Sequence, residues 1–150
     1  KSESLPTSNK KNKIKTSRYT AKENLSMIKN INEISKNIDV KEFKLIDARS
    51  KKRFEGKAPE PRKDVRSGSI PNSYCLPFGE IINENHTFKD PKKIINKFNS
   101  RLNSEITDNV VFSCGSGVTA TVLALAYSLI NNKYVPKIYD GSWAEYGKIK

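Results

Sequence analysis

The stretch VVFSCGSGVTATVLALAYSLI, residues 110–130, decides the fold of this 150-residue chain. It begins with a short apolar run, Val110–Ser113, whose length suits a buried strand. Two glycines and a serine follow within the next four residues, and an apolar run of helical length, Val118–Ile130, comes directly after them. We expect this run to be a buried helix, because it is shorter than the roughly 20 residues of a membrane span. The stretch therefore predicts a strand, a glycine-rich loop and a helix in succession.

The alternation of strand and helix continues on both sides of that stretch. Residues 43–48 (FKLIDA) and residues 137–139 have the length and apolar character of two further strands. Residues 90–102 begin with an aspartate before a proline, a pattern typical of a helix start. Thr20 and Glu23 fit a capping box ahead of a helix with apolar residues at helical spacing. Strands that alternate with helices predict an α/β domain with a parallel sheet.

Length and charge set the expected domain organisation. We expect one domain over residues 18–150 and a flexible basic linker or tail over residues 1–17. The formal net charge is +12, and residues 1–22 carry seven Lys and Arg against one acidic residue. Charge runs of this kind are usually solvated tails, and no aromatic residue is interleaved before Tyr19, so nucleic-acid binding is not expected.

The expected location follows from what the chain lacks. Its first residues have no apolar core of a secretory signal, and two cysteines are too few for a disulfide framework. No apolar run reaches membrane length, so a membrane partner is not expected either. A cytoplasmic location is therefore predicted.

Three polar turns follow the predicted strands and should meet at one edge of the sheet, where parallel α/β sheets bind ligands. They are Asp47-Ala-Arg49, Cys114-Gly-Ser-Gly117 and Asp140-Gly-Ser-Trp143. The backbone amides of the second turn and the positive end of its helix would stabilise a thiolate, which makes Cys114 the candidate nucleophile. The alternative is a structural cysteine packed at a strand end. That alternative does not explain the two glycines and the serine that follow.

Other candidate thiols and ligands carry less weight. Cys75 lies just before an apolar stretch, and we expect it to serve packing. His86 is the single histidine and has no ligand-like spacing to either cysteine. Neither a metal site nor a Cys–His dyad is therefore predicted.

Six motifs occur in the order found in the rhodanese superfamily. They are LIDAR at 45–49, RFEGKAPEPR at 53–62, SGSIPNS at 67–73, LPF at 76–78, CGSGVT at 114–119 and YDGSW at 139–143. Within the superfamily the chain resembles the carboxyl-terminal catalytic domain of the 3-mercaptopyruvate sulfurtransferases. The resemblance implies a rhodanese-like α/β fold, a parallel five-stranded sheet flanked by helices on both faces.

The resemblance also implies roles for single residues. Cys114 would take sulfur from a donor, become a persulfide and pass that sulfur to a thiol or to cyanide. Arg53 and Arg62 match the arginines that hold the carboxylate and keto group of mercaptopyruvate, a task that suits the planar guanidinium. Glu60 matches a position lining the site, where it would orient Arg62 or a substrate group, and Ser116 matches a serine that helps to shuttle a proton. The remaining substrate-contacting positions of the loop are Gly115, Gly117, Val118 and Thr119.

The resemblance extends to supporting residues and partners. Asp47 and Arg49 are expected to hold the strand end and its neighbouring loops together, and residues 140–143 to support the Cys114 loop. The family usually has two tandem rhodanese-like domains, so the chain is expected to be the carboxyl-terminal half of a longer protein. The implied partners are that amino-terminal domain, a small-molecule sulfur donor, and a thiol acceptor such as thioredoxin or a small thiol. No cofactor is implied, and a mitochondrial location is the alternative in a eukaryote.

Three other functions fit the sequence less well. A cysteine phosphatase needs an arginine after five loop residues, but position 120 is alanine and residues 115–119 include no cation. A non-catalytic rhodanese-like binding module often lacks the cysteine, which is present here. A thiosulfate sulfurtransferase resembles its relatives in placing cations at the positions of Gly115 and Ser116, whereas this chain has none there. Sulfur transfer from mercaptopyruvate is therefore favoured.

Overall fold

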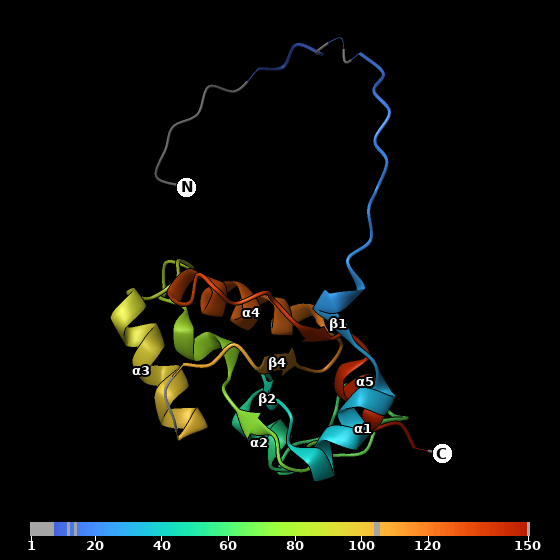
Figure 1. Cartoon of the computed structure of the whole chain (residues 1–150), viewed down its shortest axis with the longest axis vertical. Coiled ribbons are helices and arrows are strands. Elements are labelled where there is room, and N and C mark those ends of the chain that lie inside the picture. The colour runs from blue at the N-terminus through green and yellow to red at the C-terminus, as the bar shows by residue number, and fades with distance from the viewer. Residues whose placement is uncertain (1–7, 12, 14, 104–105, 150) are drawn as a thin grey trace.

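The computed structural model describes residues 8–149 apart from residues 12, 14, 104 and 105. Residues 15–24 are exposed and have no regular structure, and Figure 1 shows them leading away from the folded body. The predicted flexible tail falls partly on residues 1–7, 12 and 14, which lie outside the described part, and stays a prediction.

All strands belong to one parallel sheet with the order β1-β5-β4-β2-β3. The strands are β1 (Ile28–Lys29), β2 (Lys44–Asp47), β3 (Tyr74–Cys75), β4 (Val110–Ser113) and β5 (Ile138–Tyr139). The helical segments are η1 (Leu25–Met27), α1 (Ile31–Val40), α2 (Lys51–Phe54), η2 (Phe78–Ile81), α3 (Pro91–Leu102), α4 (Val118–Ile130) and α5 (Ser142–Tyr146). The predicted five-stranded parallel α/β fold is confirmed, and β4 is its central strand.

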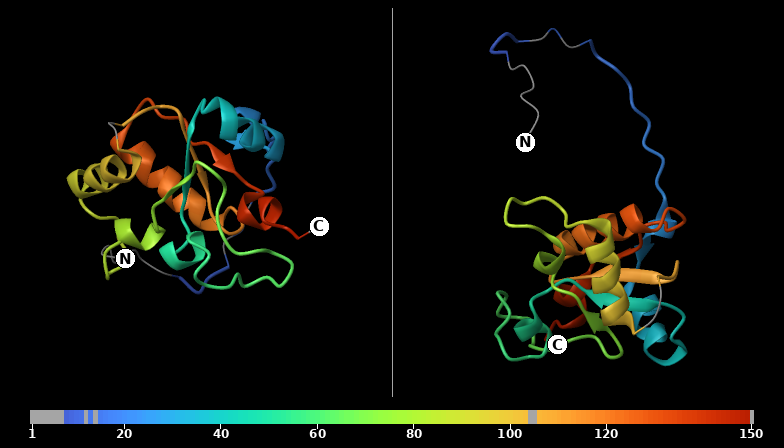
Figure 2. Two further views of the ribbon diagram at one scale, coloured as in Figure 1. Left: turned by 90° about the horizontal axis from the view of Figure 1, so that it is seen from below. Right: turned by 90° about the vertical axis from the view of Figure 1, so that its left-hand side faces the viewer.

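Helices cover both faces of the sheet. Successive side chains of β4 point to opposite faces, so this apolar strand makes both faces apolar and each needs a layer of helices to bury it. Phe112 packs against Tyr127 of α4 with 5.7 Å between the ring centroids. Its neighbour Val111 lies in a second core cluster with Ile34 of α1 and Trp143 of α5. Figures 1 and 2 show α3 and α4 on one side of the sheet and α1 and α5 on the other.

The amino-terminal helix begins later than predicted. Its capping box uses Asn30 and Glu33: the Asn30 side chain accepts a hydrogen bond from the Glu33 amide, and the Glu33 carboxylate accepts one from the Asn30 amide. Ile28–Lys29 instead pair with β5 as a strand. The predicted start at Thr20 and Glu23 is wrong, because sheet pairing satisfies the backbone before Asn30 and forces the helix to begin after it.

The helix α4 has the predicted ends but is not buried all round. Val118, Leu125 and Leu129 are 70%, 52% and 61% exposed, while Leu123 and Ala124 are buried. The exposed residues recur at helical spacing along one face, and the core covers the other face. No helix in the described part of the chain is both long enough and apolar enough to cross a membrane.

A long excursion without regular structure connects α2 to β3. Residues 56–73 consist of turns, bends and irregular chain, and an isolated bridge between Val65 and Lys148 ties the excursion to the end of the chain. At the end of the excursion, β3 pairs with β2, although no strand was predicted at residues 74–75. A two-residue strand has no periodicity, so only its pairing defines it.

Candidate active site

The loop after β4 places Cys114 at the carboxyl edge of the sheet. Cys114 is 2% exposed, and its Sγ accepts a hydrogen bond from the Ser116 amide at 3.4 Å. The amides of Cys114 and Gly117 donate instead to the hydroxyl oxygen of Ser142, each at 3.0 Å. The expectation that several amides face the sulfur is therefore corrected, because the Ser142 side chain takes two of them.

The turn after β5 supports this loop from behind. The Ser142 hydroxyl donates to the carbonyl oxygen of Tyr139 at 2.8 Å, which orients its lone pairs toward the loop amides. The Trp143 amide also donates to the Cys114 carbonyl oxygen at 3.0 Å. Because these bonds join two separate strand ends, the turn fixes the path of the chain around the sulfur, the supporting role expected for residues 140–143.

The second loop glycine has a structural position. Gly117 has a φ of 81°, in the left-handed region that favours glycine. A Cβ at Gly117 would lie 2.8 Å from the Asp140 carboxylate and 2.9 Å from its carbonyl oxygen. Gly117 therefore lies against the supporting turn, and its substrate contact stays a prediction.

A pocket of about 270 Å³ opens over the Cys114 loop. Two segments far apart in the sequence meet there, the loop with the start of α4 on one side and the excursion with α2 on the other. The predicted site residues that line it are Arg53, Glu60, Arg62, Cys114, Gly115, Ser116, Val118 and Thr119. Gly117 belongs to the same loop but is not among the residues that line the pocket.

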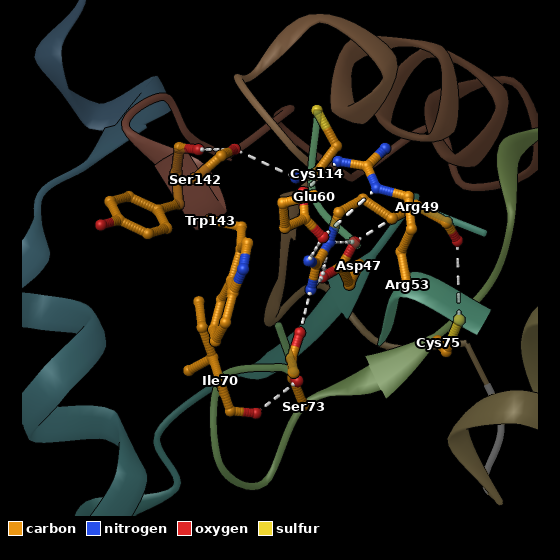
Figure 3. Close-up of polar contacts among 12 residues, drawn as sticks. Asp47, Arg49, Arg53, Glu60, Ile70, Ser73, Cys75, Cys114, Ser142 and Trp143 are labelled. Atoms are coloured by element: carbon orange, nitrogen blue, oxygen red, sulfur yellow. Dashed lines mark hydrogen bonds and ion pairs between the residues drawn. The ribbon is translucent and has the colours of Figure 1, made fainter. Parts of the chain in front are cut away.

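A chain of alternating charges lies beside the pocket, and its members Arg53 and Glu60 line the pocket (Figure 3). Arg49 is paired with Asp47 at 2.6 Å and with Glu60 at 2.7 Å, and the side chains of Arg49 and Glu60 are 1% and 4% exposed. The Arg49 guanidinium also lies 4.7 Å from the ring centroid of Trp143. Glu60 in turn pairs with Arg53 through both of its carboxylate oxygens. Glu60 therefore orients Arg53 and not the expected Arg62, while the other expected role, orienting a substrate group, stays a prediction.

The two pocket arginines differ in how firmly they are held. Arg53 uses its Nε and Nη2 for Glu60 and leaves Nη1 without a hydrogen bond to any described residue. The Arg62 side chain is exposed and has no hydrogen bond or ion pair within the described part of the chain. Both therefore keep donors that an anion in the pocket can use, Arg53 from a side chain held by Glu60 and Arg62 from an exposed side chain.

The other cysteine lies away from this pocket. Cys75 is half-buried, and its Sγ donates to the Arg49 carbonyl oxygen at 3.7 Å. Burial, together with the Asp47 carboxylate, raises the pKa of the Cys75 thiol to about 11. Within the described residues, no three His, Cys, Asp or Glu side chains gather in a way that could hold a metal ion.

We expect iodoacetate at neutral pH to label Cys114 well before Cys75. Only the thiolate is nucleophilic, and a pKa of about 11 keeps Cys75 protonated, whereas Cys114 lines a pocket with two cationic side chains. Labelling of Cys75 should rise only as the pH approaches 11. Peptide mapping by mass spectrometry measures both sites, and preferential labelling of Cys75 at neutral pH would contradict this reading.

Comparison with known proteins assigns the class. The family model of the rhodanese-like domain matches residues 30–148, which is most of the chain. The chain therefore belongs to the rhodanese-like domain family.

Individual relatives narrow the comparison. The chain is 36% identical over 145 residues to rat 3-mercaptopyruvate sulfurtransferase, covering 97% of this chain and 48% of the relative. It is 39% identical over 116 residues to the mitochondrial thiosulfate/3-mercaptopyruvate sulfurtransferase 1 of Arabidopsis thaliana, covering 77% of this chain and 30% of the relative. The solved structure of SseA from Escherichia coli, one of the 3-mercaptopyruvate sulfotransferases, superposes with a TM-score of 0.65 at 28% identity, over 84% of this chain and 45% of that one. The chain thus spans at most about half the length of these relatives.

Sequence reasoning missed the connections behind the pocket. It placed Arg49 and Ser142 in supporting segments without identifying what each side chain holds. The available signal for Arg49 is an arginine two residues after the aspartate that ends a buried strand, since a buried charge needs partners. Nothing in the sequence indicated that the Ser142 hydroxyl would accept bonds from amides 25 and 28 residues away.

Proposed function

We propose that this chain is the cysteine-bearing half of a sulfurtransferase that takes sulfur from 3-mercaptopyruvate and releases pyruvate. One observation carries the proposal: the Cys114 sulfur shares a single pocket with the guanidinium groups of Arg53 and Arg62. A donor of this class has a thiol at one end and a carboxylate and keto group at the other. The pocket has a nucleophile for the thiol end of the donor and, at a separate place, anion-binding groups for its carboxylate and keto end.

The first step transfers one sulfur atom to the enzyme. The Cys114 thiolate attacks the thiol sulfur of the donor, a sulfur–sulfur bond forms, and the carbon–sulfur bond breaks. The electron pair of the broken bond goes to carbon, giving the enolate of pyruvate, and Cys114 is left as a persulfide. Arg53 and Arg62 hold the carboxylate and keto oxygen, where negative charge develops on the enolate.

A proton completes the release of pyruvate. The hydroxyl of Ser116 lies in the loop beside Cys114 and lines the pocket, so it is placed to pass a proton to the enolate carbon. A thiol acceptor then attacks the outer sulfur, and Cys114 leaves as the thiolate. The acceptors proposed are thioredoxin, a small thiol or cyanide.

Thiosulfate is the alternative donor, and the name of the Arabidopsis relative includes it. The loop residues Gly115 and Ser116 carry no charge, so a dianionic donor lacks charge-assisted hydrogen bonds at that point. The mercaptopyruvate carboxylate lies several bonds from its sulfur, where the pocket arginines serve it. The neutral loop therefore favours mercaptopyruvate.

We expect kcat/KM for mercaptopyruvate to exceed that for thiosulfate, measured with one acceptor. Replacing Gly115 with Arg and Ser116 with Lys should shift the preference toward thiosulfate by tenfold or more, since each charge-assisted bond is worth about 1.5–3 kcal/mol. Mass spectrometry after mercaptopyruvate should show one added sulfur atom on Cys114. Equal use of both donors by the parent protein would refute the donor assignment, and no added sulfur with either donor would favour a binding module.

The proposed partner of the chain is a second rhodanese-like domain on its amino-terminal side. The support is that the chain covers 48% of the rat relative, which leaves room there for a further domain of similar size. We further propose a reducing compartment, the cytoplasm or the mitochondrial matrix, because a cysteine nucleophile must stay reduced. Comparing the sulfur-transfer rate of the complete protein with that of this chain tests whether the second domain is needed for activity.

A further inference from the structure

The short helix α2 contributes side chains to two different cavities. Arg53 lines the sulfur pocket, whereas Lys51 and Phe54 line a second cavity of about 310 Å³. Residues three apart lie on the same face of a helix, so one face of α2 serves the second cavity. The rest of its wall comes from β3 and the end of α3 and includes Cys75 and Arg101. The two cavities share no lining residue, so a ligand in one leaves the other open.

Arg101 has hydrogen-bond donors that no described residue uses. Its Nη2 donates to both carboxylate oxygens of Glu80, at 3.0 and 3.2 Å. Its Nε is buried without a hydrogen-bond partner, and its Nη1 makes no hydrogen bond to a described residue. A buried donor without a protein partner is costly and calls for an ion or a water molecule. The Arg101 guanidinium therefore has the capacity to bind an anion in addition to Glu80.

The carboxylates near this cavity are already paired. Glu55 also lines the cavity, and it pairs with Lys57 at 2.8 Å and with Lys51 at 3.7 Å. Glu80 is likewise shared between two cations, one of which is Arg101. Each of these two carboxylates therefore has two basic partners, and the charge that remains beside the cavity is positive.

The remaining wall of the cavity is less polar. Phe54 and Tyr74 are half-buried aromatic residues, and Cys75 is a half-buried thiol beside them. Burial raises the pKa of the Cys75 thiol to about 11, so the thiol adds no negative charge at neutral pH. A ligand that suits this cavity thus has one anionic group and an apolar part.

We propose that the second cavity is a binding site for a small organic anion, a carboxylate with an aromatic or short aliphatic body. Arg101 and Lys51 bind the carboxylate, and Phe54 and Tyr74 contact the apolar part. The site is separate from Cys114 and does not depend on the identity of the sulfur donor.

The two cysteines report on the two cavities separately, because Cys75 lines the second and Cys114 the first. Methyl methanethiosulfonate is a small uncharged reagent: a protein thiolate attacks its divalent sulfur, a disulfide to the methylthio group forms, and methanesulfinate leaves. At about pH 9.5 part of Cys75 is ionised, and peptide mapping by mass spectrometry gives a rate constant at each cysteine. Benzoate is the probe, benzamide is its uncharged analogue of almost equal shape, and sodium chloride keeps the ionic strength constant.

We expect benzoate to slow the labelling of Cys75 in a saturable way. Benzamide should need at least about tenfold higher concentration for the same protection, because it makes no charge-assisted hydrogen bond. Arg101→Met should raise the benzoate concentration for half-maximal protection by about tenfold as well. Lys97→Met is the matched control, because Lys97 pairs with the same Glu80 but does not line the cavity, and it should leave protection unchanged.

Other results overturn the proposal. Without protection of Cys75 by benzoate there is no such site, and equal protection by benzamide would mean that the cavity does not select an anion. Equal effects of Arg101→Met and Lys97→Met would mean that surface charge acts generally and that Arg101 is not a ligand. If the melting temperature shows that Arg101→Met is unfolded, the comparison of benzoate with benzamide on the parent chain decides. Failure of the chain to use mercaptopyruvate would refute the donor assignment alone, since no sulfur donor is present here.

Discussion

Cys114→Ser is expected to abolish sulfur transfer, lowering kcat/KM by at least about a thousandfold. A hydroxyl ionises far less readily than a thiol and cannot form a persulfide, so no sulfur should be carried. The pocket should survive, because the loop is held by backbone bonds from Cys114 and Gly117 to Ser142 and not by the sulfur. The measurement is pyruvate release from mercaptopyruvate, with a mass spectrum of the protein taken alongside.

Cys75→Ser is the matched control for this prediction. Cys75 lies outside the pocket, and its thiol donates to the Arg49 carbonyl oxygen at 3.7 Å, a bond that a serine hydroxyl can also make. Activity should therefore remain close to that of the parent. Retained transfer in Cys114→Ser, or loss of transfer in Cys75→Ser alone, would show that the nucleophile is misassigned.

Elements with a local sequence pattern could be predicted, and those made by distant pairing could not. The strand, loop and helix over residues 110–130 follow from apolar runs and two glycines close together in the chain. β1 and β3 are two residues long and exist because Ile28 pairs with Ile138 and Tyr74 with Ile46. Such short strands leave no periodicity, so the sequence assigned residue 28 to a helix.

The same distinction between local motifs and distant contacts holds for the residues of the candidate site. Cys114 and the pocket arginines could be found because single motifs carry them, and the structure brings them into one pocket. The partners of the Glu60 carboxylate could not be predicted from the sequence, because they depend on the path of the excursion, which has no regular structure. Its partner Arg49 is 11 residues away, and the bonds that shape the sulfur loop cross 25 and 28 residues.

The buried chain of charges predicts a large loss of stability when Arg49 is replaced. Arg49 lies between the carboxylates of Asp47 and Glu60 and over the ring of Trp143 (Figure 3). Its guanidinium donates to both carboxylates and also to the Gly68 carbonyl oxygen at 2.8 Å. Removing it leaves two carboxylates that are almost wholly buried without their shared cation. An uncompensated buried charge is far more costly than the loss of an exposed ion pair.

We therefore expect Arg49→Met to lower the free energy of unfolding by about 3–5 kcal/mol, measured by urea denaturation. Arg53→Met is the matched control, because Arg53 contacts the same Glu60 but its side chain is 27% exposed and Glu60 keeps Arg49 as a partner. The control should lose no more than about 1 kcal/mol, since water can reach the vacated end of the pair. A loss for Arg49→Met as small as that of Arg53→Met would show that the carboxylates find other partners or water. The expected difference between these two variants separates the arginine that holds the buried carboxylates together from the arginine proposed to bind the donor.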